Sequence, residues 1–266
     1  MSIRTIIVPY DFSECATDAL RVAGDLAHRT GAVIDVVHAY EETTHSHVEN
    51  HHIREEIEGR LARIPELPFL QGVELRKFML RQLTVTEIFK NERLSHADLI
   101  VMGTHGASGM KGIVGSNTQR IVRQAPMPVL VIKHHIEQFE LNNVVFASNF
   151  SQQDVEKFEA FRPLLDLFDA KVHLLKVNTP RTFERSEDSH RAIAGFLQRH
   201  ELRRYTVTVY NDLSIEEGIL NFAQSIDADL IAMATHGRTG FFHVVNGSIT
   251  EDIVNHTPLP VLSVKL

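Results

Sequence analysis

The chain has 266 residues, of which 43% are hydrophobic and 23% are charged, enough for one large domain or for two smaller domains with real cores. Its formal net charge of −7 argues against a nucleic-acid-binding protein, which normally carries a basic patch. The single cysteine, Cys15, excludes an intrachain disulfide, and we expect a packed or half-exposed side chain rather than a redox thiol. Because we find neither a signal peptide nor an apolar run of membrane-spanning length, we expect a cytoplasmic protein.

In chain order, short apolar runs alternate with segments of helical period. The first half predicts strands at 4–9, 33–39, 73–79, 98–103 and 128–133, and helices at 14–29, 48–63, 84–94 and 116–124. The second half predicts strands at 143–148, 171–177, 205–210, 228–233 and 260–265, and helices at 152–168, 187–200, 214–225 and 247–255. This alternation predicts an α/β fold with right-handed crossovers and parallel sheets that are covered on both faces. Ser13 and Ser151 are the expected N-caps of the first helix of each half.

The two halves are copies of one unit. The segment Asp98–Gly106 (DLIVMGTHG) recurs as Asp229–Gly237 (DLIAMATHG), and Val8–Ser13 matches Phe146–Ser151. Matches in the same order at separated places indicate a tandem repeat. We therefore predict two doubly wound domains, at 1–137 and 141–266, each with a five-stranded parallel sheet flanked by helices.

Each half has one place where a ligand is expected. In open parallel sheets, ligands bind outside the carboxyl ends of the strands, where the strand order reverses. The strand that ends at Gly103 leads into a glycine-rich stretch, and a helix begins near Ser116. Backbone N–H groups at such a helix start form a phosphate site. Neither the P-loop nor the dinucleotide-binding glycine pattern is present.

These segments resemble the universal stress protein family, over nearly the whole chain. The resemblance implies ATP or another adenine nucleotide, with Mg²⁺ as an optional companion, bound in the glycine loops. In the first half it implies base and ribose contacts from Pro9, Asp11, Ala39 and Met102, and phosphate contacts from Gly103, Gly106, Gly115, Ser116 and Asn117, with His105 ordering the loop or touching the ligand. In the second half the corresponding residues are Asn149, Val177, Met233, Ala234, Gly237, Gly247, Ser248 and Ile249, with Arg238 facing phosphate.

Neither half matches the family pattern fully. The first loop has eight residues between Gly106 and Gly115, where the family has nine. The second half keeps the nine-residue spacing, but Asn149 replaces Asp11 and Ala234 replaces Gly103. The sequence leaves open which half binds nucleotide. The alternative is a protein that lacks nucleotide binding and acts through protein–protein interaction.

We expect no catalytic residues, because no Ser-His-Asp arrangement or carboxylate pair emerges from the spacing. The resemblance also allows slow ATP hydrolysis, and autophosphorylation at Ser116 or Ser248. The family further implies pairing of the last strands, which a tandem chain can satisfy within itself as a pseudo-dimer of the two halves. A homodimer of two chains is left open by the sequence. We expect no partnership with nucleic acid or membrane.

The stretch 45–52 is rich in histidine. On a helix His47 and His51 would share a face, and two imidazoles at that spacing can bind zinc or nickel. A solvated loop and helix start is the interpretation that we favour, and no carboxylate-rich active site accompanies these histidines.

Overall fold

The protein is described from a computed structural model, which covers residues 2–40, 47–80, 87–88, 91–92, 94–104, 116–235 and 249–265. The first half contains β1 (Thr5–Pro9), α1 (Glu14–Thr30), β2 (Val33–Ala39), α2 (His47–Ala62), β3 (Leu75–Leu80), β4 (Leu99–Gly103), α4 (Ser116–Gln124) and β5 (Val129–Ile132). Short 3-10 turns lie at η1 (Ile64–Glu66), η2 (Pro68–Leu70) and η3 (Leu94–His96). The second half contains β6 (Asn143–Ala147), α5 (Gln152–Lys157), η4 (Phe158–Ala160), α6 (Arg162–Leu167), β7 (Lys171–Asn178), α7 (Ser186–Arg199), β8 (Tyr205–Asn211), α8 (Ile215–Ser225), β9 (Leu230–Thr235), α9 (Ile249–His256) and β10 (Val261–Lys265).

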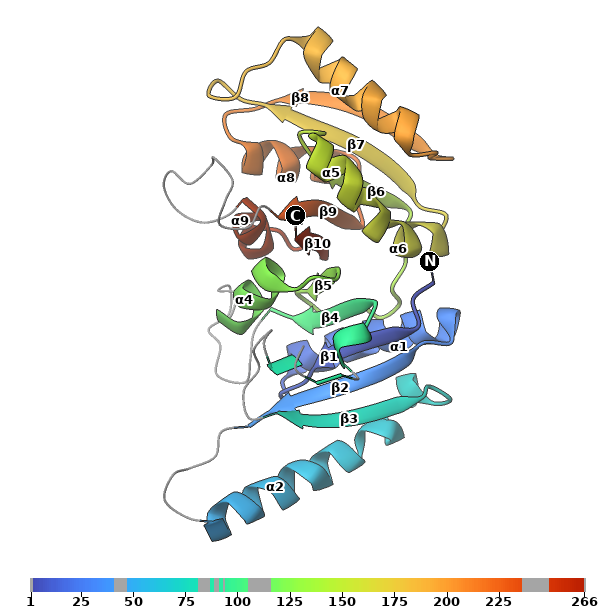
Figure 1. Ribbon diagram of the computed structural model, residues 1–266, viewed down its shortest axis with the longest axis vertical. Coiled ribbons are helices and arrows are strands. Elements are labelled where there is room, and N and C mark those ends of the chain that lie inside the picture. The colour runs from blue at the N-terminus through green and yellow to red at the C-terminus, as the bar shows by residue number, and fades with distance from the viewer. Residues whose placement is uncertain are drawn as a thin grey trace.

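All ten strands form one sheet, in the order β3-β2-β1-β4-β5-β10-β9-β6-β7-β8. Within each half the neighbouring strands are parallel, which confirms the predicted fold class. The halves meet where β5 pairs antiparallel with β10, with Leu130 opposite Leu262. Figure 1 shows this continuous sheet from β3 at one end to β8 at the other.

Of the predicted helices, one is wrong and one is only partly covered. The helix predicted over 84–94 falls largely outside the described residues, although Glu87 and Ile88 are helical. The single helix predicted over 152–168 is wrong, because the chain there divides into α5, η4 and α6. Pro163 has no N–H group to donate to the carbonyl of Glu159, so the α-helical ladder cannot run through this segment.

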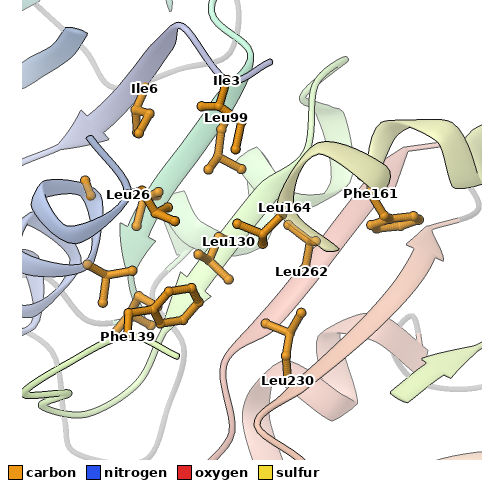
Figure 2. Close-up of a cluster of buried hydrophobic side chains, with 14 of the residues drawn as sticks. Ile3, Ile6, Leu26, Leu99, Leu130, Phe139, Phe161, Leu164, Leu230 and Leu262 are labelled. Atoms are coloured by element: carbon orange, nitrogen blue, oxygen red, sulfur yellow. The ribbon is translucent and has the colours of Figure 1, made fainter. Parts of the chain in front are cut away.

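The sheet is buried on both faces. Side chains alternate along β1, where Ile6 and Val8 belong to one hydrophobic cluster and Ile7 belongs to the other. Figure 2 shows the first cluster at the junction, with Leu130 of β5, Leu262 of β10 and Leu164 of α6 side by side. The two halves therefore share a hydrophobic core rather than touching along a polar surface.

The connection between the halves, residues 133–142, is packed against both of them. Phe139 is 1% exposed, its N–H donates to Asp25 Oδ2 of α1 at 3.0 Å, and its ring lies 5.6 Å from the ring of Phe168 in the second half. Arg29 of α1 pairs with Glu140 and lies over the same Phe168 ring. The connection thus packs between α1 of the first half and the end of α6 of the second half.

An aspartate at the same place in each half fixes the first strand of that half. Asp98 Oδ2 accepts hydrogen bonds from the backbone N–H groups of Arg4 and Thr5, just before and at the start of β1. Asp229 Oδ2 does the same for Asn142 and Asn143 at the start of β6. None of the helices in the described part of the chain has the length and apolar character needed to cross a bilayer.

Candidate functional site: the carboxyl ends of the strands

The strand order reverses once in each half. It reverses between β1 and β4 in the first half and between β6 and β9 in the second. A crevice for a ligand is expected at the carboxyl end of such a pair. In Figure 1 β2 and β7, the second strand of each half, end on the same, left side of the molecule, where α4, α8 and α9 also lie. The two candidate sites therefore open toward one side.

The turn after the first strand has a left-handed phenylalanine in both halves. Phe12 has φ +65° and Phe150 has φ +59°, a region that bulky residues rarely adopt. Each is followed by a serine that caps the next helix, since Ser13 accepts from the N–H of Ala16 and Ser151 from that of Asp154. Both predicted N-caps are confirmed. The abrupt reversal places Asp11 and Asn149 beyond the strand ends, with Asp11 partly exposed and Asn149 exposed.

Aromatic contacts hold the two strained turns. The Phe12 ring lies 5.2 Å from the Tyr10 ring and 4.8 Å from the His38 ring, and the guanidinium of Arg60 from α2 covers it at 3.8 Å. Phe150 is buried against Phe146 and Phe196, at ring separations of 6.0 and 5.3 Å. Such packing offsets the cost of the left-handed backbone.

The second strand of each half supplies a basic side chain beneath this turn. In the first half His38 Nδ1 lies 2.7 Å from the carbonyl oxygen of Tyr10, and burial lowers the pKa of His38 below its ordinary value of 6.5. Its neutral imidazole thus donates to the turn. In the second half Lys176 occupies this position; its Nζ donates to Glu184 at 2.6 Å and to the carbonyl of Asn149 at 3.4 Å.

The end of β4 packs directly on the start of α1. A Cβ added to Gly103 would lie 2.7 Å from both the carbonyl oxygen and the Sγ of Cys15, so only glycine fits. The N–H of Thr104 donates to Cys15 Sγ at 3.2 Å, and Thr118 of α4 donates to the carbonyl of Gly103 at 3.1 Å. The first residues of the glycine-rich segment are therefore fixed from two sides, by α1 and by α4.

The corresponding strand end of the second half carries Ala234, a methyl group larger than Gly103. Gln153 stands where the first half has Cys15. The helix that follows is also shorter, because α5 ends at Lys157. The two candidate sites therefore differ in the helix beside the strand end as well as in the replacement of Asp11 by Asn149.

The structure brings several predicted site residues together. Pro9 and Met102 are buried at the ends of adjacent strands β1 and β4, and Ala39 ends β2. In the second half Met233 is buried in β9, Val177 is half-buried near the end of β7, and Ile249 begins α9. Ser116 and Asn117 begin α4, as an N-terminal phosphate site requires. The predicted residues that lie outside the described residues are His105, Gly106, Gly115, Gly237, Arg238, Gly247 and Ser248.

The histidine-rich stretch is helical in part. His47 begins α2, and the exposed ring of His51 faces Glu55 on the same helix at 3.4 Å. No cluster of three or more His, Cys, Asp or Glu side chains suited to a metal ion occurs among the residues that the structure describes.

Three side chains at the site did not emerge as ligand-site residues from the sequence. Cys15 meets Thr104 across 89 positions and Arg60 reaches Phe12 from a separate helix, so no local pattern predicts either contact. Lys176 stands in an apolar strand, where a buried charge is unusual. A lysine within an apolar run is the sequence feature that could have indicated this residue.

Comparison with known proteins gives a consistent picture. The model of the universal stress protein family matches residues 2–133 and again 142–265. A universal stress protein of Thermus aquaticus is 35% identical over 136 residues, which are 49% of this chain and 98% of that protein. One of Synechocystis sp. is 29% identical over 175 residues, covering 62% of this chain but only 57% of the relative.

Solved structures agree in fold over the full chain. The crystal structure of a universal stress protein from Archaeoglobus fulgidus superposes with a TM-score of 0.76 at 21% identity, covering 98% of each chain. A functionally unknown protein from Pseudomonas aeruginosa PAO1 gives a TM-score of 0.66 at 17% identity, covering 99% of this chain and 92% of its own. With the family model matched twice along its length, this chain belongs to the universal stress protein family as a tandem, two-domain member.

Proposed function

We propose that this protein is a stress-response or signalling module that binds an adenine nucleotide at the carboxyl ends of its strands. The observation that carries the proposal is the reversal of strand order in the first half, where Asp11 follows the end of β1, and Gly103 at the end of the neighbouring β4 leads into the glycine-rich segment. A carboxylate at the strand end can accept hydrogen bonds from ribose hydroxyls, and charge makes such bonds about twice as strong as neutral ones. The start of α4 suits the phosphates.

The proposal assigns unequal roles to the two halves. In the second half an amide replaces the carboxylate, and Lys176 is buried beside it in an ion pair with Glu184. We therefore assign the tighter ribose contact to the first half. Cytoplasmic location, Mg²⁺ as a companion of the phosphates and assembly of two chains as a homodimer belong to the same proposal.

The first experiment denatures the untagged protein and measures released nucleotides by mass spectrometry, followed by calorimetric titration with ATP. Asp11→Asn, which gives the first half the residue of the second, should weaken ATP binding about tenfold, since one charge-assisted hydrogen bond becomes neutral. Asn149→Asp is the reciprocal variant and should tighten the second site. Asp188→Asn, on the exposed face of α7, is the control and should leave both affinities unchanged.

Two outcomes would contradict the proposal. One is the absence of ATP, ADP and AMP binding at millimolar concentration in the wild-type chain. The other is an unchanged affinity in both Asp11→Asn and Asn149→Asp. Either would favour the interaction protein.

A further inference from the structure

The pairing of β5 with β10 inside the chain leaves β3 and β8 as the two ends of the sheet. Figure 1 shows β8 at the upper end, beside α7. An end strand presents a row of backbone N–H and C=O groups that can pair with another chain. Because the last strands of the two halves are already joined to each other, a second chain can extend this sheet only at β3 or at β8.

The two end strands differ in how they are protected against pairing. β3 carries Arg76 and the exposed Lys77, and charged side chains on an end strand discourage the approach of another strand. β8 has the sequence YTVTVYN, which holds no charged residue and consists mainly of aromatic and β-branched residues that favour strand pairing. Its Tyr205 and Val207 are 44% and 37% exposed, so the flanking helices leave part of this strand uncovered. The β8 end is therefore the one that is open to pairing.

The hydrogen bonds to β7 show which backbone groups of β8 remain available. The N–H of Val172 donates to the carbonyl oxygen of Arg204 at 2.9 Å, and the N–H of Asp212 donates to that of Asn178 at 3.0 Å. Since the backbone groups of successive strand residues point to alternate sides, the even-numbered residues from 204 to 212 face β7. The groups that point away from β7 belong to Tyr205, Val207, Val209 and Asn211. They have no hydrogen-bond partner among the residues that the structure describes.

A second copy of the chain fits this edge in one defined register. Two copies related by a two-fold axis pair their β8 strands antiparallel. The midpoint of β8 is Thr208, so full overlap places Thr208 opposite its own copy and Val207 opposite Val209. Odd-numbered residues then face odd-numbered residues, as the hydrogen-bonded pairs of an antiparallel ladder require. The free backbone groups of the two strands are therefore complementary.

The same register brings opposite charges together at both ends of the paired strands. Arg204 of each copy lies opposite Asp212 of the other, at a non-hydrogen-bonded position where Cα atoms are about 4.5 Å apart. Within the chain, Arg204 pairs with Asp169 at 3.5 Å in an exposed ion pair of the kind that contributes little. Asp212 accepts only neutral donors in the described part of the chain, the N–H of Leu213 and the amide of Asn221. This charge pattern matches a second copy, whereas an unrelated extended segment has no reason to carry it.

We propose that two chains associate by antiparallel pairing of their β8 strands, which makes one continuous sheet across both. This names the surface of the homodimer in the proposed function and rests on that part of it alone. Nucleotide binding is not required, because the pairing uses the outer edge of β8 and none of the candidate site residues.

The test is sedimentation equilibrium of the full chain without nucleotide, in which the wild type should form a dimer. Arg204→Asp and Asp212→Arg each place like charges opposite each other twice, so each variant alone should dimerise about tenfold more weakly. An equimolar mixture of the two variants should recover the wild-type affinity, because opposite charges face each other again in the mixed dimer. Lys77→Asp makes the same charge change on β3 and is the matched control, which should leave dimerisation unchanged.

A proline at the free edge tests the backbone pairing itself. Val207→Pro removes an N–H group that points away from β7, so it should weaken the dimer at least about tenfold while the chain stays folded, as thermal unfolding checks. The proposal is overturned if the wild type is a monomer at about 0.1 mM, which would leave the edge to an extended segment of another protein. It is also overturned if the dimer persists unchanged in Val207→Pro, or if the mixture of charge variants stays as weak as either alone. ATP titration of the same samples reports separately on the proposed nucleotide binding.

Discussion

Single residues decide how closely the elements around the first crevice approach one another. At Gly103 the backbone of β4 touches Cys15 of α1, whereas the second half accommodates Ala234 at the same place. Glycine here serves close packing, since no left-handed conformation is recorded for it. The two halves therefore allow glycine and alanine to be compared at the same position of the fold.

Gly103→Ala should destabilise the protein by about 1–3 kcal/mol, because the new methyl group would overlap the backbone of Cys15. Urea unfolding measures the change in the free energy of unfolding. Ala234→Gly, the reciprocal change, should cost no more than about 1 kcal/mol, through backbone entropy alone. Equal stabilities of Gly103→Ala and wild type would show that α1 moves away without cost.

Two buried histidines should make stability fall as the pH is lowered. Burial lowers the pKa of His38 and of His173 below the ordinary value of 6.5. As the pH falls through 6.5 the unfolded chain takes up protons that the folded chain does not, so the free energy of unfolding decreases from pH 7.5 to pH 5.5. Urea titrations across this range should show the loss, and His38→Gln with His173→Gln should flatten it. A profile equally steep in the double variant would contradict this account.

At the scale of elements, the sequence predicted the strands well and the helices less uniformly. Near-continuous apolar runs such as that of β4 are typical of buried parallel strands. Because the two halves repeat, each strand of one half also predicts a strand at the matching place in the other. The division of 152–168 was missed because Phe158 and Phe161 fit a helical period while Pro163 interrupts the hydrogen bonds. At the candidate site, the predicted residues lie at strand ends, and the sequence pattern locates strand ends. The contacts of Cys15 and Arg60 depend on packing between distant segments, and the sequence pattern does not predict that packing.

Helix starts at the crevice should depend on their serine caps. Ser151→Ala removes a capping box in which Ser151 and Asp154 bond reciprocally, and Ser13→Ala removes a single cap bond. Each should cost about 1 kcal/mol in the free energy of unfolding, measured with urea. Ser186→Ala is the control, because α7 begins without a side-chain cap bond and should be nearly unaffected. A loss in Ser186→Ala as large as in Ser151→Ala would argue against the caps as the cause.

At the scale of the molecule, the shared core and the packed connection should make the two halves unfold together. Phe139 lies between α1 and the end of α6, fully buried. Phe139→Ala should lower the free energy of unfolding by about 3–5 kcal/mol. It should also split the single thermal transition into two, measured by calorimetry. Phe183→Ala, which changes a side chain that is 74% exposed, should stay within about 0.5 kcal/mol of wild type. Two transitions in the wild-type chain would contradict a shared core.

The pairing of β5 with β10 inside one polypeptide also frees the halves to diverge. In a symmetric homodimer any substitution appears in both subunits, so a change that alters one pocket alters its twin. Here the aspartate at 11 coexists with asparagine at 149, and the glycine at 103 with alanine at 234. A tandem chain therefore has what identical subunits cannot have: two strand ends whose residues change independently of each other.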